Sequence, residues 1–359
     1  MKLVEYIEKY GNLSFNDKPF NGVDKLILAN LSYVDYMDTV SNNDKYKRRL
    51  EDVKLDFFNK NYQNKKNIIA IKGGIKLLKL MSNTKRYKDL LLYNYVRIVD
   101  DIEQFSAITI EINKNLVYVS FEGTADEMIG WEEDFQMCYK FPIKSQRSAI
   151  RYLNKCFLFR NVNIIVGGHS KGGNLALVGS MYCNFLIKHK IREVYSYDGP
   201  GLLSKQLKSH KYKTIEKKYF HIVPNNSMIG MMLYSKSHLA IKTNYVGILS
   251  HYALNWQVDE FDLIKDALKK SSLELEKRLS NWIEKYSYNE KKMFVREMFD
   301  VFRNNKVFTL LDFMERPTAL IKIISDSNKV SKQTSIMFRE FVGMVRKFLF
   351  KSVSEKIIK

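Results

Sequence analysis

Residues 162–178 read Val-Asn-Ile-Ile-Val-Gly-Gly-His-Ser-Lys-Gly-Gly-Asn-Leu-Ala-Leu-Val, and this segment carries the strongest indication of the fold. Its first five residues have the apolar, β-branched composition of a short buried strand, whereas its last six favour a helix. Between them lies a Gly-x-Ser-x-Gly pattern, Gly168-His169-Ser170-Lys171-Gly172. This pattern is typical of a sharp strand-to-helix turn that exposes a nucleophilic serine, because larger residues at the glycine positions would clash. The alternative is a glycine-rich turn with an idle serine.

The same turn offers a donor for a developing negative charge. The backbone N–H of Lys171 begins the predicted helix, and an unpaired donor at a helix N-terminus favours an anion, so Lys171 is a candidate for the oxyanion hole. A second donor is expected from residues 121–124, Phe-Glu-Gly-Thr, where Thr124 offers its backbone N–H and its hydroxyl. The alternative for Thr124 is a simple turn. Asp126 and Asp134 are interpreted as loop and helix-capping residues.

The segments around this turn alternate between strand and helix patterns. The strands at 106–112 and 116–121 form a predicted hairpin, and the later alternation predicts parallel strands with helices on both faces. Residues 1 to about 100 and those from about 262 onward show mostly helical spacing. We therefore predict an α/β-hydrolase domain over 1–260, with a mostly parallel central sheet flanked by helices and a helical amino-terminal portion of about 1–100. A helical carboxy-terminal extension is predicted over 261–359. The remaining predicted strands are 162–166, 194–197 and 219–223, and the predicted helices beside them are 146–157 and about 172–189.

A catalytic acid is expected after the serine, at the carboxyl end of a later strand. Asp198 follows the predicted strand 194–197, and Gly199-Pro200 would turn the chain sharply and leave the carboxylate at the sheet edge. The corresponding position after the next strand, residues 224–227, reads Pro-Asn-Asn-Ser and has no carboxylate, which favours Asp198. The alternative for Asp198 is an Asx-type turn residue.

The base should follow the acid, and four histidines do so. His210 lies in a lysine-rich polar stretch, and His221 lies inside a predicted strand. His238 could lie in a loop, whereas His251 follows Gly-Ile-Leu-Ser and precedes an aromatic segment that ends at Trp256. We prefer His251, and the alternative is another histidine or a structural role.

The composition limits the partners of the chain. A net charge of +20 would attract an anionic partner, unless the excess lysine is simply spread over solvated faces. We favour a membrane surface over nucleic acid, because no basic-aromatic motif of a nucleic-acid-binding module is present. No metal-ligating spacing and no glycine-rich nucleotide loop occurs, so no cofactor is expected.

The cysteines and the apolar stretches bear on location. The three cysteines lack the paired spacing of a disulfide framework or a zinc cluster. The first residues, Met-Lys-Leu-Val-Glu-Tyr, carry charge too early for the apolar core of a secretory signal. No stretch approaches the roughly 18 uninterrupted apolar residues that span a bilayer. We expect a cytoplasmic protein, with a peripheral contact to the inner face of the membrane as an option. The cysteines are Cys138, Cys156 and Cys183.

Several of these residues resemble known families. Phe121-x-Gly123-Thr124, Trp131, Asp134-Phe135 and Gly168-His169-Ser170-x-Gly172-Gly173 resemble the pattern of class 3, fungal-type lipases. More closely, residues from 1 to roughly 260 resemble a family of largely uncharacterised bacterial proteins with a lipase-like α/β-hydrolase domain. That resemblance implies an intracellular acyl-ester hydrolase. Its further residues are Phe20-Asn21-Gly22-Val23-Asp24, Gly130-Trp131-Glu132-Glu133-Asp134-Phe135, Asn174-Leu175-Ala176, Asp198-Gly199-Pro200-Gly201, Val223-Pro224, Ser227-x-x-Gly230-Met231, and His251 with Trp256.

Two positions depart from the pattern of these families. Glu122 stands where they usually carry arginine, which leaves the anchoring of the oxyanion loop open. The class 3 acid precedes Val-Pro, and that position is His221 here, so the acid must come from elsewhere. Asp198 is similar in placement to the acid of pancreatic-type lipases.

Together these features predict a serine hydrolase that cleaves acyl esters or lipids through an acyl-enzyme, with Ser170, His251 and Asp198 as its triad. The alternative is a non-catalytic α/β-hydrolase-fold scaffold or a membrane-surface binding module. The predicted helix over about 336–358 carries an apolar stripe on a basic background. We expect the stripe to pack on the hydrolase domain as a lid or to form a dimer contact, and the alternative is contact with anionic lipid. The stripe consists of Phe338, Phe341, Val342, Val345, Phe348, Leu349 and Val353.

Overall fold

The central element of the fold is an eight-stranded sheet in which the strands lie side by side in their sequence order. The computed structural model describes residues 1–59, 69–125, 127–308 and 330–357, with side chains up to Val345 in the last helix. The first four strands pair antiparallel and the last five, β4 to β8, pair parallel. The strands are β1 (Arg48–Arg49), β2 (Leu91–Val99), β3 (Gln104–Asn113), β4 (Leu116–Phe121), β5 (Asn163–His169), β6 (Ile191–Tyr197), β7 (Tyr219–Pro224) and β8 (Leu239–Ile241).

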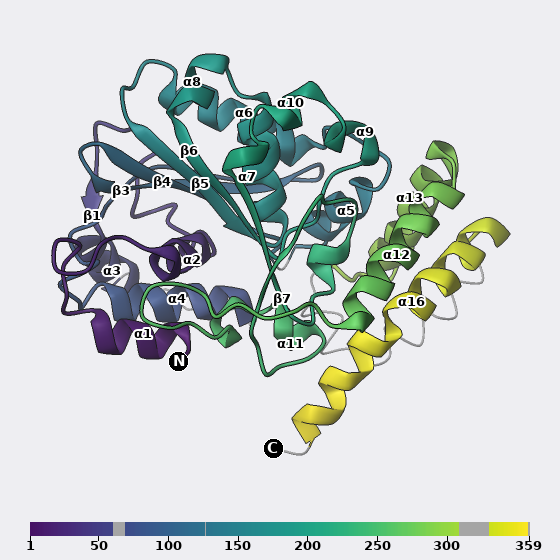
Figure 1. The fold of residues 1–359 in the computed structure, drawn as a ribbon. Helices are drawn as coiled ribbons and strands as arrows, with labels where there is room; N and C mark the ends of the chain where they lie inside the picture. Colours follow the sequence, from purple (N-terminus) through teal and green to yellow (C-terminus); the bar gives the residue numbers. More distant parts are fainter. Residues whose placement is uncertain (60–68, 126, 309–329, 358–359) are drawn as a thin grey trace.

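Helices cover both faces of this sheet (Figure 1). Tyr118 of β4 packs into a core with the amino-terminal helices α1 to α4, whereas its neighbours Val117 and Val119 pack into a core with α6, α7 and α8. Successive side chains of a strand point to opposite faces, so the two cores lie on opposite sides of the sheet. The helices of these layers are α1 (Leu3–Tyr10), α2 (Gly22–Leu31), α3 (Leu50–Asn59), α4 (Ile69–Met81), α6 (Lys144–Phe157), α7 (Lys171–Tyr182) and α8 (Phe185–Lys190).

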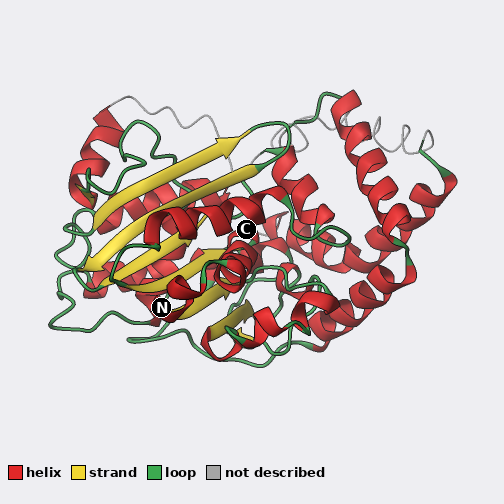
Figure 2. Cartoon of the chain, turned by 90° about the horizontal axis from the view of Figure 1, so that it is seen from above, coloured by secondary structure: helices red, strands yellow, loops and turns green. Residues whose placement is uncertain are grey.

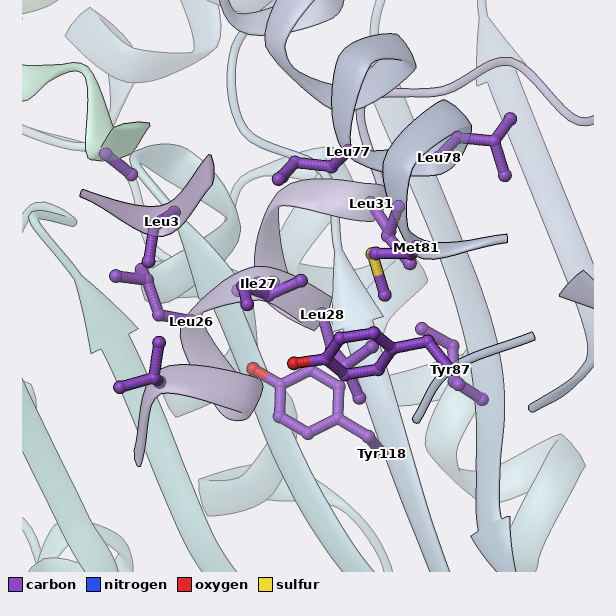
Figure 3. Close-up of a cluster of buried hydrophobic side chains, with 14 of the residues drawn as sticks. Leu3, Leu26, Ile27, Leu28, Leu31, Leu77, Leu78, Met81, Tyr87 and Tyr118 are labelled. Atoms are coloured by element: carbon purple, nitrogen blue, oxygen red, sulfur yellow. The ribbon is translucent and has the colours of Figure 1, made fainter. Parts of the chain in front are cut away.

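The amino-terminal core holds α2 between the sheet and α4. Figure 3 shows Leu26, Ile27 and Leu28 of α2 among the side chains of neighbouring helices, with Tyr118 reaching in from β4. The buried Asp24 of this helix is compensated, because both of its oxygens accept hydrogen bonds from the guanidinium of Arg86, at 2.9 and 2.5 Å. A buried carboxylate needs such a partner to be tolerated.

The predicted α/β-hydrolase architecture is confirmed, because a mostly parallel sheet flanked by helices carries a strand-to-helix turn between β5 and α7. Residues 91–99, expected to end a helical region, instead form β2 and pair antiparallel with β3. The long helix predicted over about 172–189 is interrupted, because the Asn184 side chain accepts the Leu186 N–H and starts a new helix, α8. The predicted boundary near residue 260 stays a prediction.

Short elements connect the later strands, and the residues after 260 begin without helix. Ile264 and Asp266 bond to the backbone of Lys242 and Ala240 and extend the edge beyond β8, so the helical spacing from about 262 is overruled by sheet pairing until α12 begins. The remaining elements are α5 (Met128–Gln136), α9 (Ser204–Leu207), α10 (His210–Lys213), η1 (Glu216–Lys218), η2 (Ile229–Met231), α11 (Ile248–His251), η3 (Ala253–Asn255), α12 (Lys270–Lys285), α13 (Tyr288–Asn304) and α16 (Lys332–Ile357).

Helices α12, α13 and α16 group at one end of the sheet (Figure 1), and the view from above in Figure 2 shows helices gathered beyond the strand ends. Phe341 of α16 packs against Phe135 of α5 and Trp282 of α12, with ring centroids 5.2 and 6.0 Å apart. Val345 lies in a second apolar cluster with Leu279 of α12. Part of the predicted apolar stripe therefore packs on the protein itself, and the side chains beyond Val345 lie outside the described residues. None of the described helices combines the length and apolarity that crossing a membrane requires.

Candidate active site

Ser170 lies at the corner between β5 and α7, in a strained backbone conformation. Its φ of 57° and ψ of −134° are unusual for a residue with a side chain, and its N–H bonds to the carbonyl of Tyr197 on β6 at 2.9 Å. Such strain is held in place by the surrounding structure and is typical of functional sites. The turn itself is closely packed, since a Cβ at Gly172 would lie 2.1 Å from the carbonyl oxygen of Phe121. The glycine is needed because β4 ends directly against the turn.

Asp198 and His251 meet beside this corner. Asp198 follows β6 at the carboxyl edge of the sheet, with a φ of 50°, and its Oδ2 lies 2.6 Å from Nδ1 of His251. His251 is the last residue of α11, and the Trp256 indole N–H bonds to the carbonyl of Ser250 at 2.8 Å and fixes this short helix. The structure thus brings together an acid and a histidine that are 53 residues apart in the chain.

The carboxylate of Asp198 is completely buried and has two further donors. Its Oδ1 accepts the Ser227 hydroxyl at 2.5 Å and the Gly230 N–H at 3.0 Å. Burial alone would raise the pKa of Asp198, but the hydrogen bond from His251 and the one from Ser227 hold it below its ordinary value. The carboxylate is therefore ionised at neutral pH and can orient the His251 imidazole.

His169 stands against His251 as a second, uncharged imidazole. The two ring centroids lie 4.4 Å apart. Nε2 of His169 lies 2.7 Å from the His251 carbonyl, which can only accept, so this nitrogen carries the proton. Nδ1 lies 2.8 Å from the Tyr33 hydroxyl and accepts its hydrogen. Burial, together with the neighbouring His251, lowers the pKa of His169 to about 3, so this ring remains neutral.

The loop after β4 lies against the serine corner. A Cβ at Gly123 would be 3.0 Å from the Cβ of Ser170, and Thr124 follows at once. The Thr124 hydroxyl donates to Oδ2 of Asp134 on α5, so it is not free for an oxyanion while Asp134 is ionised. Asp134 lies inside α5 and not at either end, so its interpretation as a capping residue is wrong, whereas Asp126 lies outside the described residues. The backbone N–H remains the donor that Thr124 can offer. Burial raises the pKa of Asp134 to about 6.

Lys171 has its side chain turned into the protein below this loop. Its Nζ is buried and donates to the carbonyl and side-chain oxygens of Gln104, both at 2.9 Å, and forms an ion pair with Glu133 at 3.2 Å. The backbone N–H of Lys171 is the first of α7 and therefore has no acceptor within the helix. The side chain anchors the corner, and the N–H is available to a substrate.

Glu122, which departs from the family pattern, is paired within the protein. It is buried, and Nη1 of Arg97 on β2 donates to its Oε2 at 2.8 Å. The Gln104 amide donates to the same oxygen and to the carbonyl of Gly123, both at 3.2 Å. Burial raises the pKa of Glu122 to about 7, although Arg97 opposes this rise. The loop after β4 is therefore anchored by a cation from β2, which lies on the far side of β3.

The site residues predicted from the sequence gather at one edge of the sheet. Ser170, Asp198, His251, Thr124 and Lys171 all lie on segments that contact the β5–α7 corner. Among the hydrogen bonds of the described residues, none joins the Ser170 hydroxyl to His251. Catalytic hydrogen bonds are often long in unliganded hydrolases and shorten when substrate binds.

A comparison with known families assigns the chain. The model of the family described as Mbeg1-like matches residues 81–300, which contain every predicted site residue. The chain belongs to the Mbeg1-like family. No curated protein matches the Mbeg1-like chain in sequence.

Solved structures similar to this Mbeg1-like chain include fungal lipases. The lipase of Rhizopus microsporus var. chinensis is 15% identical over 42% of this chain and 60% of its own, with a TM-score of 0.29. The Lip2 lipase of Yarrowia lipolytica is 12% identical over 51% and 72%, with a TM-score of 0.34. A fungal lipase solved as an inhibitor complex is 12% identical over 62% and 77%, with a TM-score of 0.36. The chain thus spans less than two thirds of the length of the Rhizopus lipase, and the superpositions are partial.

Three residues of the Mbeg1-like site are not identified as functional by sequence reasoning. Asp134, His169 and Ser227 each contact one of the predicted site residues or its carbonyl. All three lie within the segments that carry the family resemblance, which was the available signal. Their partners are distant in the chain, so spacing alone could not assign them a role.

Proposed function

We propose that this Mbeg1-like protein is a serine hydrolase that cleaves acyl esters, with Ser170 as nucleophile, His251 as general base and Asp198 as the residue that orients it. The observation that carries the proposal is the 2.6 Å hydrogen bond between Nδ1 of His251 and Asp198, beside a serine held at a φ of 57°. With Nδ1 bound to the carboxylate, Nε2 of His251 is left as the base.

The proposed reaction has two steps, acylation of Ser170 and hydrolysis of the acyl-serine. Oγ of Ser170 attacks the ester carbonyl carbon, and Nε2 of His251 takes the hydroxyl proton and passes it to the departing alcohol oxygen. The C–O bond to the alcohol breaks, and an acyl-serine forms. Water then attacks the acyl-serine with the same proton transfers, which releases a carboxylic acid and restores Ser170. The N–H groups of Thr124 and Lys171 stabilise the oxyanion in both halves.

A fluorophosphonate probe tests this proposal, because it phosphonylates an activated serine. Labelling of the folded protein, mapped by mass spectrometry, is expected on Ser170 and is expected to disappear in Ser170→Ala. Ser180→Ala is the matched control, because Ser180 is a buried serine on the same helix whose hydroxyl has no hydrogen-bond partner among the described residues. Folded wild-type protein that takes up no probe would remove the proposal.

The non-catalytic alternative makes the opposite prediction, since a scaffold would bind its partner unchanged in Ser170→Ala. The two departures from the family pattern, Glu122 and the missing acid before Val223-Pro224, are compatible with catalysis, because Glu122 is paired with Arg97 and the carboxylate of Asp198 reaches His251. A cytoplasmic location and a peripheral contact with anionic membrane remain proposals that follow from the sequence and its net charge of +20.

A further inference from the structure

The positive charge of the chain is concentrated in one stretch of the sequence. Residues 135–215 contain 14 lysines and arginines and two acidic residues, so these 81 residues carry 12 of the 20 net positive charges. The two acidic residues do not neutralise the surface of this stretch. Glu193 pairs with Lys25 of α2, on the other side of the sheet, at 2.6 Å, and Asp198 is completely buried. The excess of lysine and arginine is therefore not spread evenly over the molecule.

This stretch forms one face of the molecule. Helices α6, α8, α9 and α10 lie on the side of the sheet opposite to α1–α4 (Figure 1). The Asn184 N–H before α8 donates to the Asn154 side chain of α6 at 2.8 Å, which joins these two helices. Lys211 of α10 lies near Lys188 of α8, since its charge adds to burial in lowering the pKa of Lys188. We call six exposed cations of this side the basic face, namely Arg151, Lys155, Arg192, Lys208, Lys211 and Lys213.

The basic face is not neutralised from within the part of the chain that the structure describes. None of the ion pairs there involves one of its six cations, and two acidic side chains beside it have other partners. Asp44 pairs with Arg160 at 3.4 Å, and Glu216 pairs with Lys236 at 2.6 Å. Surface charges of one sign attract an anionic partner, and added salt weakens this attraction. A negatively charged partner is therefore expected at the basic face.

Large apolar side chains are exposed beside the basic face. Phe159 is 95% exposed, and Phe185 and Leu186 of α8 are 66% and 47% exposed. Nζ of Lys190 donates to the carbonyl of Phe157 at 2.9 Å, which holds the loop of Phe159 against α8. Exposed apolar side chains next to lysines are typical of proteins that rest on an anionic bilayer, where the rings enter the boundary between headgroups and acyl chains. A nucleic-acid base can stack on an exposed ring, but it offers no apolar layer to the aliphatic Leu186.

We propose that the basic face, together with Phe159 and Phe185, docks this protein on an anionic lipid surface. The membrane contact is thereby assigned to this face and not to α16. The loop of Phe159 precedes β5 and α8 precedes β6, so both lie at the amino-terminal edge of the parallel strands, whereas Ser170 follows β5 at the carboxyl edge. Docking would thus leave the serine corner uncovered. The inference does not depend on the proposed hydrolase activity.

Vesicle sedimentation of the full-length protein tests the role of the charge. The wild type is expected to bind phosphatidylcholine vesicles that contain phosphatidylserine, and to bind them less tightly as salt is added. Each lysine near an anionic surface contributes roughly a fivefold gain in affinity, so the triple replacement Lys155→Gln, Lys208→Gln and Lys211→Gln is expected to weaken binding roughly a hundredfold. The matched control replaces three exposed lysines of α4, on the other side of the sheet, by glutamine, and its affinity is expected to equal that of the wild type. The control lysines are Lys72, Lys76 and Lys79.

Replacing an exposed ring tests the apolar contribution without disturbing the core. Phe159→Ser is expected to weaken binding to the same vesicles roughly tenfold, because the serine has no ring to transfer from water into the bilayer boundary. Ile102→Ser is the matched control, because Ile102 is 57% exposed in the turn between β2 and β3, at the opposite edge of the sheet. Its affinity is expected to equal that of the wild type.

The outcomes separate the docking surface from its alternatives. A wild type that does not bind phosphatidylserine vesicles, or a basic-face variant that binds them as tightly as the α4 variant, would overturn the lipid assignment. Binding to a duplex oligonucleotide in place of the vesicles would overturn it in favour of nucleic acid. Sedimentation does not involve the serine, so a protein that binds vesicles through this face but takes up no probe at Ser170 would contradict the proposed function and support the docking surface.

Discussion

The replacement Asp198→Asn tests the hydrogen bond that joins Asp198 to His251. Oδ1 of Asp198 already accepts two donors, the Ser227 hydroxyl and the Gly230 N–H. An asparagine would place its oxygen there, because that is its one acceptor group, and its NH₂ would then face Nδ1 of His251. Nδ1 would have to accept this hydrogen, so the proton of the imidazole would move to Nε2. A protonated Nε2 cannot take a proton from Ser170.

The size of the effect follows from the geometry. The active tautomer has its proton on Nδ1, and in the variant this N–H would face the NH₂ of the asparagine, so two donors would oppose each other. The charge-assisted hydrogen bond between His251 and Asp198 is then lost, at a cost of about 1.5–3 kcal/mol. The imidazolium formed during attack would also lose a counter-charge, worth about 4 kcal/mol at an effective dielectric constant near 20. With partial overlap between these two terms, we expect a loss of about 5 kcal/mol in transition-state stabilisation, or roughly a thousand- to ten-thousand-fold in rate.

The assay is the second-order rate of fluorophosphonate labelling, together with kcat/KM for p-nitrophenyl acetate. Asp266→Asn is the control, because the exposed carboxylate of Asp266 also accepts a short hydrogen bond, at 2.6 Å from Asn225, and is not joined to His251 by any hydrogen bond among the described residues. We expect the control to react as the wild type does. A folded Asp198→Asn protein that keeps more than about a tenth of the wild-type rate would show that Asp198 does not orient His251, since a loss of about 5 kcal/mol excludes that rate.

Two further predictions concern stability. Gly172→Ala would place a methyl group 2.1 Å from a backbone oxygen of β4, so we expect a loss of several kcal/mol in the free energy of unfolding by urea, on the order of an overpacked core site. Gly343→Ala meets nothing within 4 Å on α16, and it is expected to stabilise the helix by up to about 1 kcal/mol; equal effects of the two replacements would contradict this account. The second prediction is that stability depends on pH. The pKa of His169 is lowered from 6.5 to about 3 in the folded protein, so the folded state binds fewer protons than the unfolded state. The folded protein therefore loses stability as the pH falls below about 6.5. In His169→Gln, the slope of the free energy of unfolding against pH is expected to become smaller by up to about 1.4 kcal/mol per pH unit. Urea unfolding between pH 6 and 5 measures this slope, and an unchanged slope would argue against a neutral buried imidazole.

Much of the parallel half of the fold could be predicted from the sequence. The strand and helix around Ser170 have strong local signals, because a short apolar β-branched run and a small-residue helix are joined by glycines that only a tight turn requires. The sequence does not predict the strand at residues 91–99. Their mixture of aromatic, apolar and charged residues has no clear local preference, and pairing with β3 makes them a strand. The helix expected from about residue 262 begins only at α12 for the same reason, since the residues before α12 pair with the strand β8.

The candidate site divides in a similar way. The order Ser170, Asp198, His251 is a property of the chain, and the turn chemistry around each residue limits which side chains reach the sheet edge. The pairing of Glu122 with Arg97 is different, because the two residues are 25 positions apart and meet only once the sheet places β2 and β4 on either side of β3. The neutral state of His169 likewise depends on its burial and on the neighbouring His251, which lies 82 residues further along the chain.

The serine turn, the element order that follows it and the candidates for acid and base can be recognised without the structure, because they depend on local conformational preferences. The donors around Asp198, the anchoring of the loop after β4 and the packing of α12 and α16 on the sheet end depend on the folded structure. Hydrogen bonds and packing act over a few ångströms, so contacts between residues far apart in the chain exist only once the sheet has brought their segments together.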